Sequence, residues 1–253
     1  SSSNIDISSV TVKNSGDDGM VISSSSTNIE NSTIQNNGDD GIILSSNAFI
    51  YNNIIKSNSG VGIHMYEGSA YARVISNTID DNDDQGVIIS QSHHVKLTNN
   101  VIEDNENYGV QLYYANFTQI HNNTIDDNDG GIRFIATRYS NVTKTTLEDN
   151  NGRGIWFTTN SDSNNIRDTS VSGSTNDDLE LDSSKKNTGF NFTFGNGKID
   201  VDTDSDFRVM NSLNIRFIDE NSNAFPGLDI ELFNHDTVLY ATEFFGGSKP
   251  TSN

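Results

Sequence analysis

The amino-acid sequence predicts an all-β fold, a right-handed parallel β-helix of about nine coils of 21–24 residues. Three observations predict it. A short motif repeats along the chain, apolar residues recur singly at fixed spacings, and glycine and asparagine return at the same places in each repeat. Because a solenoid buries one narrow core by stacking its coils, the hydrophobic content of only 32% is sufficient and does not indicate disorder.

The repeat is plainest in the segments STIQNNGDDGIIL, NTIDDNDDQGVII, NVIEDNENYGVQL and NTIDDNDGGIRF. A glycine precedes the last apolar pair of each repeat, with steps of 22, 21, 24, 23, 22 and 23 residues, at Gly19, Gly41, Gly62, Gly86, Gly109, Gly131 and Gly154. These steps give the coil length. We expect the glycines to occupy a sharp turn that needs either a positive φ or a close backbone approach.

Two apolar positions five residues apart precede the glycine in each coil, for example Leu97 and Ile102, or Ile120 and Ile125. Side chains alternate along a strand, so an odd spacing predicts two short strands joined by a corner. After the glycine the apolar period becomes two, as at Ile132 and Phe134, which predicts the third strand of each coil.

Asparagine recurs in two columns of its own. The members are Asn53, Asn77, Asn100 and Asn123, and then Asn37, Asn58, Asn82, Asn105, Asn128 and Asn150. Amides stacked at the coil rise of ~4.8 Å can hydrogen-bond along the solenoid axis. We interpret both columns as architectural.

The repeat ends near Asp206, which divides the chain into a β-helix over 1–206 and a different segment over 207–253. The second segment alternates at Leu213, Ile215 and Phe217 and predicts antiparallel strands. It resembles the first strands of immunoglobulin-like or carboxypeptidase-regulatory-like domains, as a partial β-sandwich, because a complete sandwich needs about 100 residues. We expect its open sheet edge to pair with another copy of the chain.

The amino-acid composition limits the kinds of molecule that the chain is expected to bind. A formal charge of −20 disfavours nucleic acid, since phosphates would be repelled, and favours cations. The chain has no cysteine and no apolar run long enough to enter a membrane, and it opens inside a repeat, which indicates a piece of a longer chain. Five Asn-X-Ser/Thr sequons predict an extracellular or cell-surface glycoprotein, at Asn31, Asn116, Asn122, Asn141 and Asn191.

The repeats over about residues 4–206 resemble the right-handed parallel β-helix repeat family, which includes pectate-lyase-like and NosD-like solenoids of secreted and cell-surface proteins. The resemblance implies the fold. It does not choose a function, because the family includes lyases, hydrolases, epimerases, adhesins and structural modules.

The outward residues of the third strands form a strip of aromatic and polar side chains. The candidate carbohydrate or partner face is His64, Tyr66, Gln111, Tyr113, Tyr114, Arg133 and Trp156. Aromatic rings and arginine suit a polysaccharide, but Val21, Ile43 and Ile88 share the strip, which favours cross-coil packing or a protein contact. Catalysis would need a base, and His64 and Arg133 lie three coils, ~14 Å, apart, too far to act on one proton.

Two GDDG segments, residues 16–19 and 38–41, resemble the paired aspartates of β-helical polygalacturonases. The same place in later repeats reads NDDQG, NENYG and NDGG, which is typical of a turn, and the accompanying histidine and arginine signatures are missing. We therefore interpret both segments as turns and expect no catalytic residues. His93 and His94 are similarly interpreted as a solvated turn rather than a metal site.

Acidic residues also fall into columns. In register, the first column is Asp80, Glu103, Asp126 and Glu148, and the second is Asp81, Asp104, Asp127 and Asp149. Stacked carboxylates ~4.8 Å apart repel one another by ~1 kcal/mol in water. Calcium bound between coils would relieve that repulsion, and the alternative is a solvated acidic surface adapted to salt.

These observations together favour a noncatalytic extracellular structural or adhesion module of a larger cell-surface or filament protein, partnered by other copies of itself or by neighbouring surface proteins. The alternative is a polysaccharide-binding or polysaccharide-degrading β-helix protein of lyase-like or hydrolase-like activity. A NosD-like metal-handling protein is disfavoured, because the chain lacks clusters of methionine and cysteine.

Overall fold

The structure is a computed structural model that describes residues 5–23, 26–195, 198–210, 228–233 and 239–245. The chain divides into two compact units, residues 1–211 and 212–253, and each is considered by itself. The described ranges contain only strands and irregular segments, so they hold no helix that is long and apolar enough to span a membrane.

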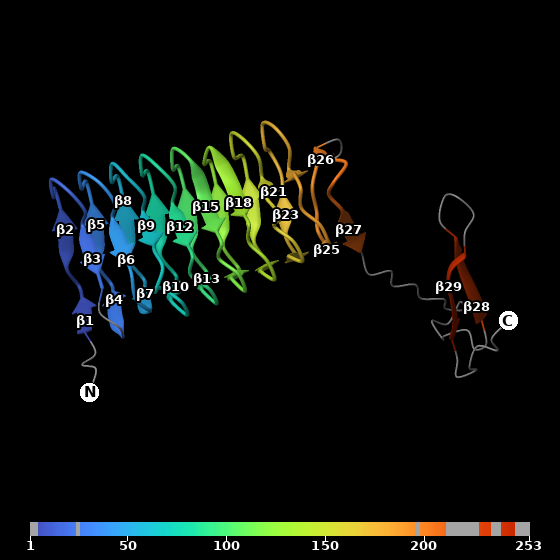
Figure 1. Cartoon of the computed structure of the whole chain (residues 1–253), viewed down its shortest axis with the longest axis horizontal. Coiled ribbons are helices and arrows are strands. Elements are labelled where there is room, and N and C mark those ends of the chain that lie inside the picture. The colour runs from blue at the N-terminus through green and yellow to red at the C-terminus, as the bar shows by residue number, and fades with distance from the viewer. Residues whose placement is uncertain (1–4, 24–25, 196–197, 211–227, 234–238, 246–253) are drawn as a thin grey trace, which may run out of the picture. The chain divides into compact units, whose positions relative to one another are not determined.

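The first unit is a solenoid of three parallel sheets, one strand from each sheet per coil (Figure 1). Sheet A consists of β1 (Ile5–Ser8), β4 (Thr27–Glu30), β7 (Ala48–Tyr51), β10 (Arg73–Ile75), β13 (Lys96–Thr98), β16 (Gln119–His121), β19 (Asn141–Thr143), β22 (Asn165–Arg167), β25 (Asn187–Phe190) and β27 (Phe207–Met210). Sheet B consists of β2 (Thr11–Lys13), β5 (Thr33–Gln35), β8 (Ile54–Lys56), β11 (Thr78–Asp80), β14 (Val101–Glu103), β17 (Thr124–Asp126), β20 (Thr146–Glu148) and β23 (Ser170–Val171). Sheet C consists of β3 (Met20–Ile22), β6 (Ile42–Leu44), β9 (Ile63–Met65), β12 (Val87–Ser90), β15 (Tyr108–Tyr113), β18 (Gly130–Ile135), β21 (Ile155–Thr158), β24 (Leu179–Leu181) and β26 (Ile199–Val201).

The core is a set of stacked aliphatic rows, as predicted. Ile79 pairs with Ile102, and Ile102 with Ile125, and all three side chains have no exposed surface. The predicted corner between the two apolar positions is also present, since Leu97 lies on β13 of sheet A and Ile102 on β14 of sheet B. The odd spacing of five residues therefore places both side chains in one core.

Buried asparagines form the two predicted ladders. Asn100 Nδ2 donates to Asn123 Oδ1 at 2.9 Å, and the same oxygen accepts the backbone N–H of Asn100 at 2.9 Å. In the second ladder, Asn105 Nδ2 donates to Asn128 Oδ1 at 2.9 Å. A buried amide without partners would cost ~1–3 kcal/mol, so the ladders make the polar corners compatible with a closed core.

The repeated glycines are required by close packing rather than by φ. A Cβ on Gly62 would lie 2.6 Å from the carbonyl oxygen of Gly86 and 2.6 Å from Ile79 Cγ2. Positive φ values fall instead on the corner residues, including Asn99 (φ 56°) and Asp104 (φ 54°). Of the two explanations that the sequence allowed, only the close backbone approach applies to this column.

The solenoid extends past the predicted boundary at Asp206. Strand β27 (Phe207–Met210), which the sequence assigned to the C-terminal segment, pairs in parallel with β25 and adds a strand to sheet A. In the second unit, β28 (Leu228–Phe233) and β29 (Leu239–Phe245) pair antiparallel. The rest of the predicted immunoglobulin-like domain, residues 211–227, 234–238 and 246–253, lies outside the described residues, so that domain and its pairing edge stay predictions.

Replacing Ile102 with Asp should unfold the solenoid, because an unpaired carboxylate would enter a row with no exposed surface. We expect a loss of at least about 3 kcal/mol in the free energy of unfolding, measured by denaturant titration. The matched control is Ile54→Asp, on the same sheet, where the isoleucine is 44% exposed. Equal destabilisation by both variants would contradict the assigned core.

Candidate functional site

The outward face of sheet C carries the predicted strip in one continuous register. Ile88 of β12 pairs with Gln111 of β15, Gln111 with Arg133 of β18, and Arg133 with Trp156 of β21. On the N-terminal side, Ile88 pairs with His64 of β9. The predicted residues therefore share one face, but their side chains gather into two separate clusters along it.

The first cluster is built around His64. Its Nδ1 lies 2.8 Å from Oδ2 of Asp40, and the other carboxylate oxygen of Asp40 accepts the backbone N–H of Val61 at 2.7 Å. Asp40 is 7% exposed, so the pair is held in a partly dry environment. When Nδ1 carries the proton that this hydrogen bond needs, Nε2 of His64 has its lone pair available as a base.

Tyr66 completes this end of the face. Its ring stacks on the His64 imidazole with centroids 4.0 Å apart. Burial raises the pKa of the Tyr66 hydroxyl, and the carboxylates of Asp40, Asp18 and Asp39 raise it further. The hydroxyl therefore keeps its proton at neutral pH and acts as a hydrogen-bond donor.

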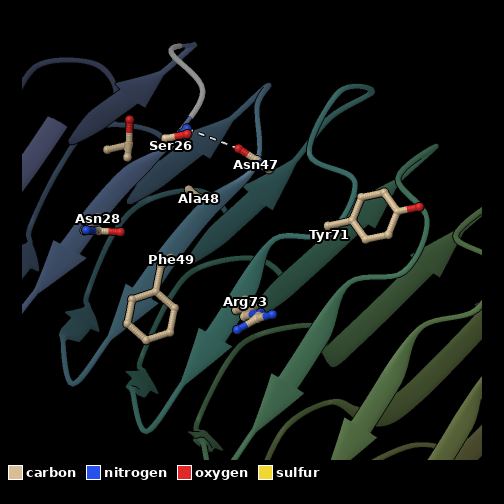
Figure 2. Close-up of a pocket in the computed structure, with 8 residues that line it drawn as sticks. Ser26, Asn28, Asn47, Ala48, Phe49, Tyr71 and Arg73 are labelled. Atoms are coloured by element: carbon tan, nitrogen blue, oxygen red, sulfur yellow. Dashed lines mark hydrogen bonds between the residues drawn. The ribbon is translucent and has the colours of Figure 1, made fainter. Parts of the chain in front are cut away.

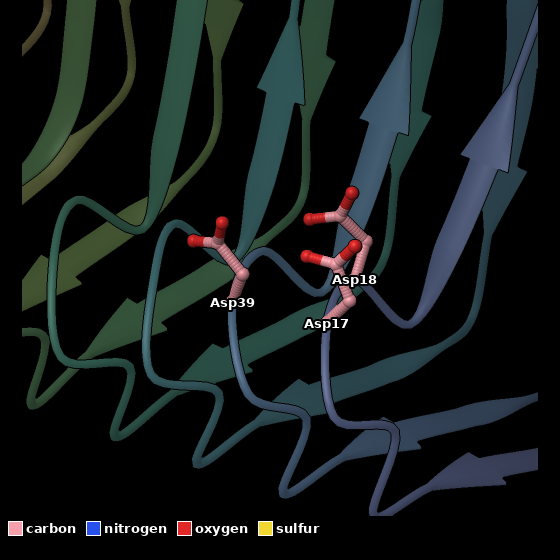
Figure 3. Close-up of side chains that lie close together, drawn as sticks. All are labelled: Asp17, Asp18 and Asp39. Carbon is pink, nitrogen blue, oxygen red and sulfur yellow. The ribbon is translucent and has the colours of Figure 1, made fainter.

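Three further carboxylates lie next to the Asp40–His64 pair. Asp17, Asp18 and Asp39 each offer an oxygen within 4.8 Å of the other two (Figure 3). Burial raises the pKa of Asp18 and neighbouring carboxylates add to the rise, while the backbone N–H of Asp40, which donates to Asp18 Oδ1 at 3.2 Å, opposes it. The GDDG segments, interpreted from sequence only as turns, thus also present carboxyl groups to one site.

The second cluster combines aromatic rings with guanidinium groups. Arg133 lies 4.2 Å and Arg153 4.3 Å from the ring centroid of Trp156, and Tyr108 lies 6.4 Å from it between centroids. Arg153 forms an ion pair with Glu180. Arg133 has no carboxylate partner in the described part of the chain, and burial lowers its pKa. Two guanidinium groups already contact the Trp156 ring, so it is not an open platform for a sugar.

The sequence missed the partners that give these clusters their chemistry. Asp40 reaches His64 from the preceding coil, two residues before its own sheet C strand. Tyr108 and Arg153 occupy the equivalent place in their own coils. The repeat shows that these three residues share one position, directly before the repeated glycine. It does not show that they contact the outward residue of the next coil, because that contact depends on side-chain conformation.

The remaining predicted face residues lie toward the end of the β15 strand. Tyr113 and Tyr114 meet edge to face with centroids 4.6 Å apart, and they are 38% and 47% exposed. Gln111 lies between the two clusters in the outward column. These residues do not join either cluster.

The acidic columns have the predicted register. Asp80 pairs with Glu103, Glu103 with Asp126, and Asp126 with Glu148. The second column occupies corner positions of positive φ, from 47° to 56°, at Asp81, Asp104, Asp127 and Asp149. Burial raises the pKa values of Asp80, Glu103 and Asp126, and neighbouring carboxylates add to each rise. Among the described residues, however, only Asp17, Asp18 and Asp39 bring three metal-ligating groups within 4.8 Å of one another.

The sequon asparagines differ in their surroundings. Nδ2 of Asn122 donates to Asn99 at 2.8 Å, and Nδ2 of Asn191 donates to Asp168 at 2.8 Å, so both amides are already engaged. Asn31 is exposed, and Asn116 and Asn141 are half-buried. Glycosylation of the five stays a prediction.

A separate pocket of about 490 Å³ lies over sheet A (Figure 2). Its lining includes Asn28, Asn47, Phe49, Tyr71 and Arg73. None of these belongs to the predicted face.

Two family models match the chain. The right-handed beta helix region matches residues 1–141, and the periplasmic copper-binding protein NosD matches residues 76–221. No curated protein sequence matches.

Copper sites in proteins use imidazole and sulfur ligands. This chain has no cysteine, and two of its three methionines, Met20 and Met65, are buried in the core. In the part of the chain that the structure describes, no histidine belongs to a group of three metal-ligating side chains. The described residues therefore do not fit a copper site.

Several solved structures share the fold. The A-module of the mannuronan C-5 epimerase AlgE4 from Azotobacter vinelandii is 15% identical, with a TM-score of 0.67 over 83% of this chain and 62% of its own. The catalytic unit of the GH87 α-1,3-glucanase from Streptomyces thermodiastaticus is 16% identical, with a TM-score of 0.61 over 82% of this chain and 48% of its own. Pectate lyase Pel9A is 13% identical, with a TM-score of 0.54 over 75% of this chain and 55% of its own.

These three names all denote enzymes that act on polysaccharides. These neighbours contradict the expectation of a noncatalytic structural or adhesion module, and they favour the polysaccharide alternative, which is taken up below as a proposal. The identities are low enough that the likeness itself concerns the fold, and the chain spans less than two thirds of each of these proteins. Because each family model covers more than half of the residues, the chain belongs to the right-handed β-helix and NosD families.

Proposed function

We propose that this protein binds a polysaccharide across the outward face of sheet C and cleaves it at the cluster formed by His64, Asp40 and the neighbouring carboxylates. The observation that carries the proposal is the convergence of Asp18, Asp39 and the Asp40–His64 pair from three successive coils. An extracellular or cell-surface location is part of the proposal, and the periplasmic description of the NosD family supports it.

The proposed chemistry needs two carboxyl groups in different roles. Glycoside hydrolysis needs one protonated acid to donate to the leaving oxygen and one carboxylate to activate water or attack the sugar. Asp18 suits the acid, because burial and like charges raise its pKa. Asp39 suits the second role, with its oxygen within 4.8 Å of Asp18. Asp40 orients His64. His64 in turn acts as a second base or as a positioning residue.

The other end of the face supplies binding. Arg133 is half-buried, has no ionic partner among the described residues, and lies three coils from His64, ~14 Å along the axis. A chain lying along the face would reach both clusters. Guanidinium groups favour anionic groups, so Arg133 would contact a carboxylate or sulfate of a sugar away from the cleaved bond.

Calcium on the acidic columns is a further part of the proposal. Oxygen ligands at Asp104 and Asp127, in the middle of the second column, suit calcium, and the raised pKa values of Glu103 and Asp126 support real repulsion between coils. A bound cation would change that repulsion into attraction between neighbouring coils.

The purified protein should release reducing ends from at least one polysaccharide in a panel of uncharged glucans, pectate and alginate. Asp18→Asn and His64→Ala should each lower the rate at least about 100-fold, since acid–base groups contribute that much. The control is Asp129→Asn, an exposed aspartate at the same repeat position as Asp39. Wild-type protein that cleaves nothing, or variants that cleave normally, would contradict the proposal.

The cleavage rate should fall as pH rises through the pKa of Asp18. The rate falls rather than rises because a general acid works only while it is protonated. The pKa of Asp18 lies above its usual value of 3.8, because burial and neighbouring carboxylates raise it. A pH profile should therefore show a descending limb that lies above the usual carboxyl pKa of 3.8. A rate that keeps rising into alkaline pH would exclude Asp18 as the acid.

Calcium at millimolar concentration should raise the melting temperature more than sodium chloride of matched ionic strength. Asp104→Asn combined with Asp127→Asn should remove most of that gain, and asparagine is compatible with the positive φ at both positions. Equal stabilisation by sodium would show diffuse screening and no specific site.

A further inference from the structure

A second surface lies where each sheet C strand turns toward sheet A. In several coils this turn passes through two residues of positive φ, such as Gln91 (φ 52°) and His94 (φ 60°), then Tyr114 (φ 50°) and Phe117 (φ 58°). Because this conformation repeats, the outward side chains of the turn form columns along the axis, apart from the His64 cluster.

Two adjoining pockets follow these columns. One, of about 480 Å³, is lined by Glu67, Gln91, His93, Tyr114 and Asn116. The other, of about 290 Å³, is lined by Tyr114, Asn116, Ala136, Arg138, Thr159 and Asn160. They share Tyr114 and Asn116, and we call them together the corner groove. From Gln91 to Thr159 the groove crosses three coil steps, ~14 Å, which suits an extended chain better than a compact small molecule.

Hydrogen bonds with the backbone fix the polar groups of the groove. His93 Nδ1 accepts the backbone N–H of Asn116 at 3.1 Å, so the proton of the neutral imidazole is on Nε2. Asn116 Oδ1 accepts the backbone N–H of Arg138 at 2.7 Å, which leaves Nδ2 as a donor. Neither Nε2 of His93 nor Nδ2 of Asn116 has a partner among the described residues. When Asn116 carries no glycan, two oriented donors one coil apart are therefore available to a ligand.

The groove also holds a fixed aromatic ring. Tyr114 is 47% exposed, and its edge-to-face contact with Tyr113 at 4.6 Å restrains it. An exposed ring face with negative charge density attracts the C–H groups of a pyranose ring. The neighbouring rings of Tyr71, His94, Phe117 and Tyr139 are less suitable, because they stack on one another at 4.9, 4.9 and 5.3 Å.

Charge selects the kind of sugar. Arg138 is paired with Asp162 at 3.7 Å and donates Nε to the carbonyl of Asn160 at 3.2 Å. Glu67 brings a negative charge to the other end of the groove. Among the described residues that line the groove, no unpaired guanidinium is left for a carboxylate. Hydroxyl groups of an uncharged sugar match the amides, imidazole and phenol that line the groove.

We propose that the corner groove is a binding track for an uncharged polysaccharide, stacked on Tyr114 and hydrogen-bonded by His93 and Asn116. The proposal rests on the proposed function in that the ligand is a polysaccharide. It adds a site separate from the His64 cluster and specifies an uncharged sugar there.

The test measures binding of the purified chain to soluble dextran, soluble β-1,3-glucan and polygalacturonate by affinity electrophoresis. Tyr114→Asn removes the ring at a positive φ that asparagine accepts, and should weaken glucan binding at least about tenfold. Asn116→Asp keeps the acceptor for Arg138 and removes the donor, and should weaken binding by a smaller factor. The matched control, Tyr139→Asn, removes an exposed tyrosine of φ 58° outside the groove and should bind as wild type.

Several outcomes would overturn the track. These are unchanged glucan binding by Tyr114→Asn, equal losses in Tyr114→Asn and Tyr139→Asn, binding of polygalacturonate alone, or a glycan on Asn116 found by mass spectrometry. Circular dichroism and melting curves of each variant separate loss of binding from loss of folding. Reducing-end release that depends on His64, found together with unchanged glucan binding by Tyr114→Asn, would remove the track and leave the proposed function standing. Wild-type protein that neither binds nor cleaves any of these polysaccharides would remove both.

Discussion

Parallel hydrogen bonding between successive coils places each residue directly beside its equivalent one coil away, and the rest of the structure depends on that register. Ile79, Ile102 and Ile125 pair in turn along sheet B and form a core row. The same register stacks asparagine on asparagine, so that the amide N–H of one side chain donates to the amide oxygen of the asparagine on the next coil. A chain with few apolar residues can fold this way because each coil adds its share to one continuous core and one continuous set of ladders.

The register that stabilises apolar and amide columns destabilises columns of like charge. Asp80, Glu103 and Asp126 stand beside one another at half-buried strand ends, and their raised pKa values show that folding disfavours their ionised forms. Such groups lower stability as pH rises through their folded pKa values, because the unfolded chain ionises them more easily. Repulsion among the acidic columns thus lowers the stability of the solenoid, and salt or bound cations would reduce that repulsion.

Function, in contrast, is expected where the repeat is broken. The outward column of sheet C changes from Ile43 to His64 and later from Gln111 to Arg133. His64 and Arg133 each contact side chains from neighbouring coils, since His64 pairs with Asp40 and Arg133 lies over the rings of Tyr108 and Trp156. The repeated scaffold supplies rigid spacing of ~4.8 Å, and single departures from it supply the chemistry.

Sequence alone determined the all-β solenoid, its coil length, the aliphatic rows, both asparagine ladders and the register of the acidic columns, because all of these depend on residues at one repeat position. Only the tertiary structure decided that Asp40 reaches His64, that two guanidinium groups contact the Trp156 ring, and that β27 continues sheet A. These features include a contact between different repeat positions on neighbouring coils, that of Asp40 with His64. They depend on side-chain conformation and on the packing of a degenerate last coil, which periodicity does not encode.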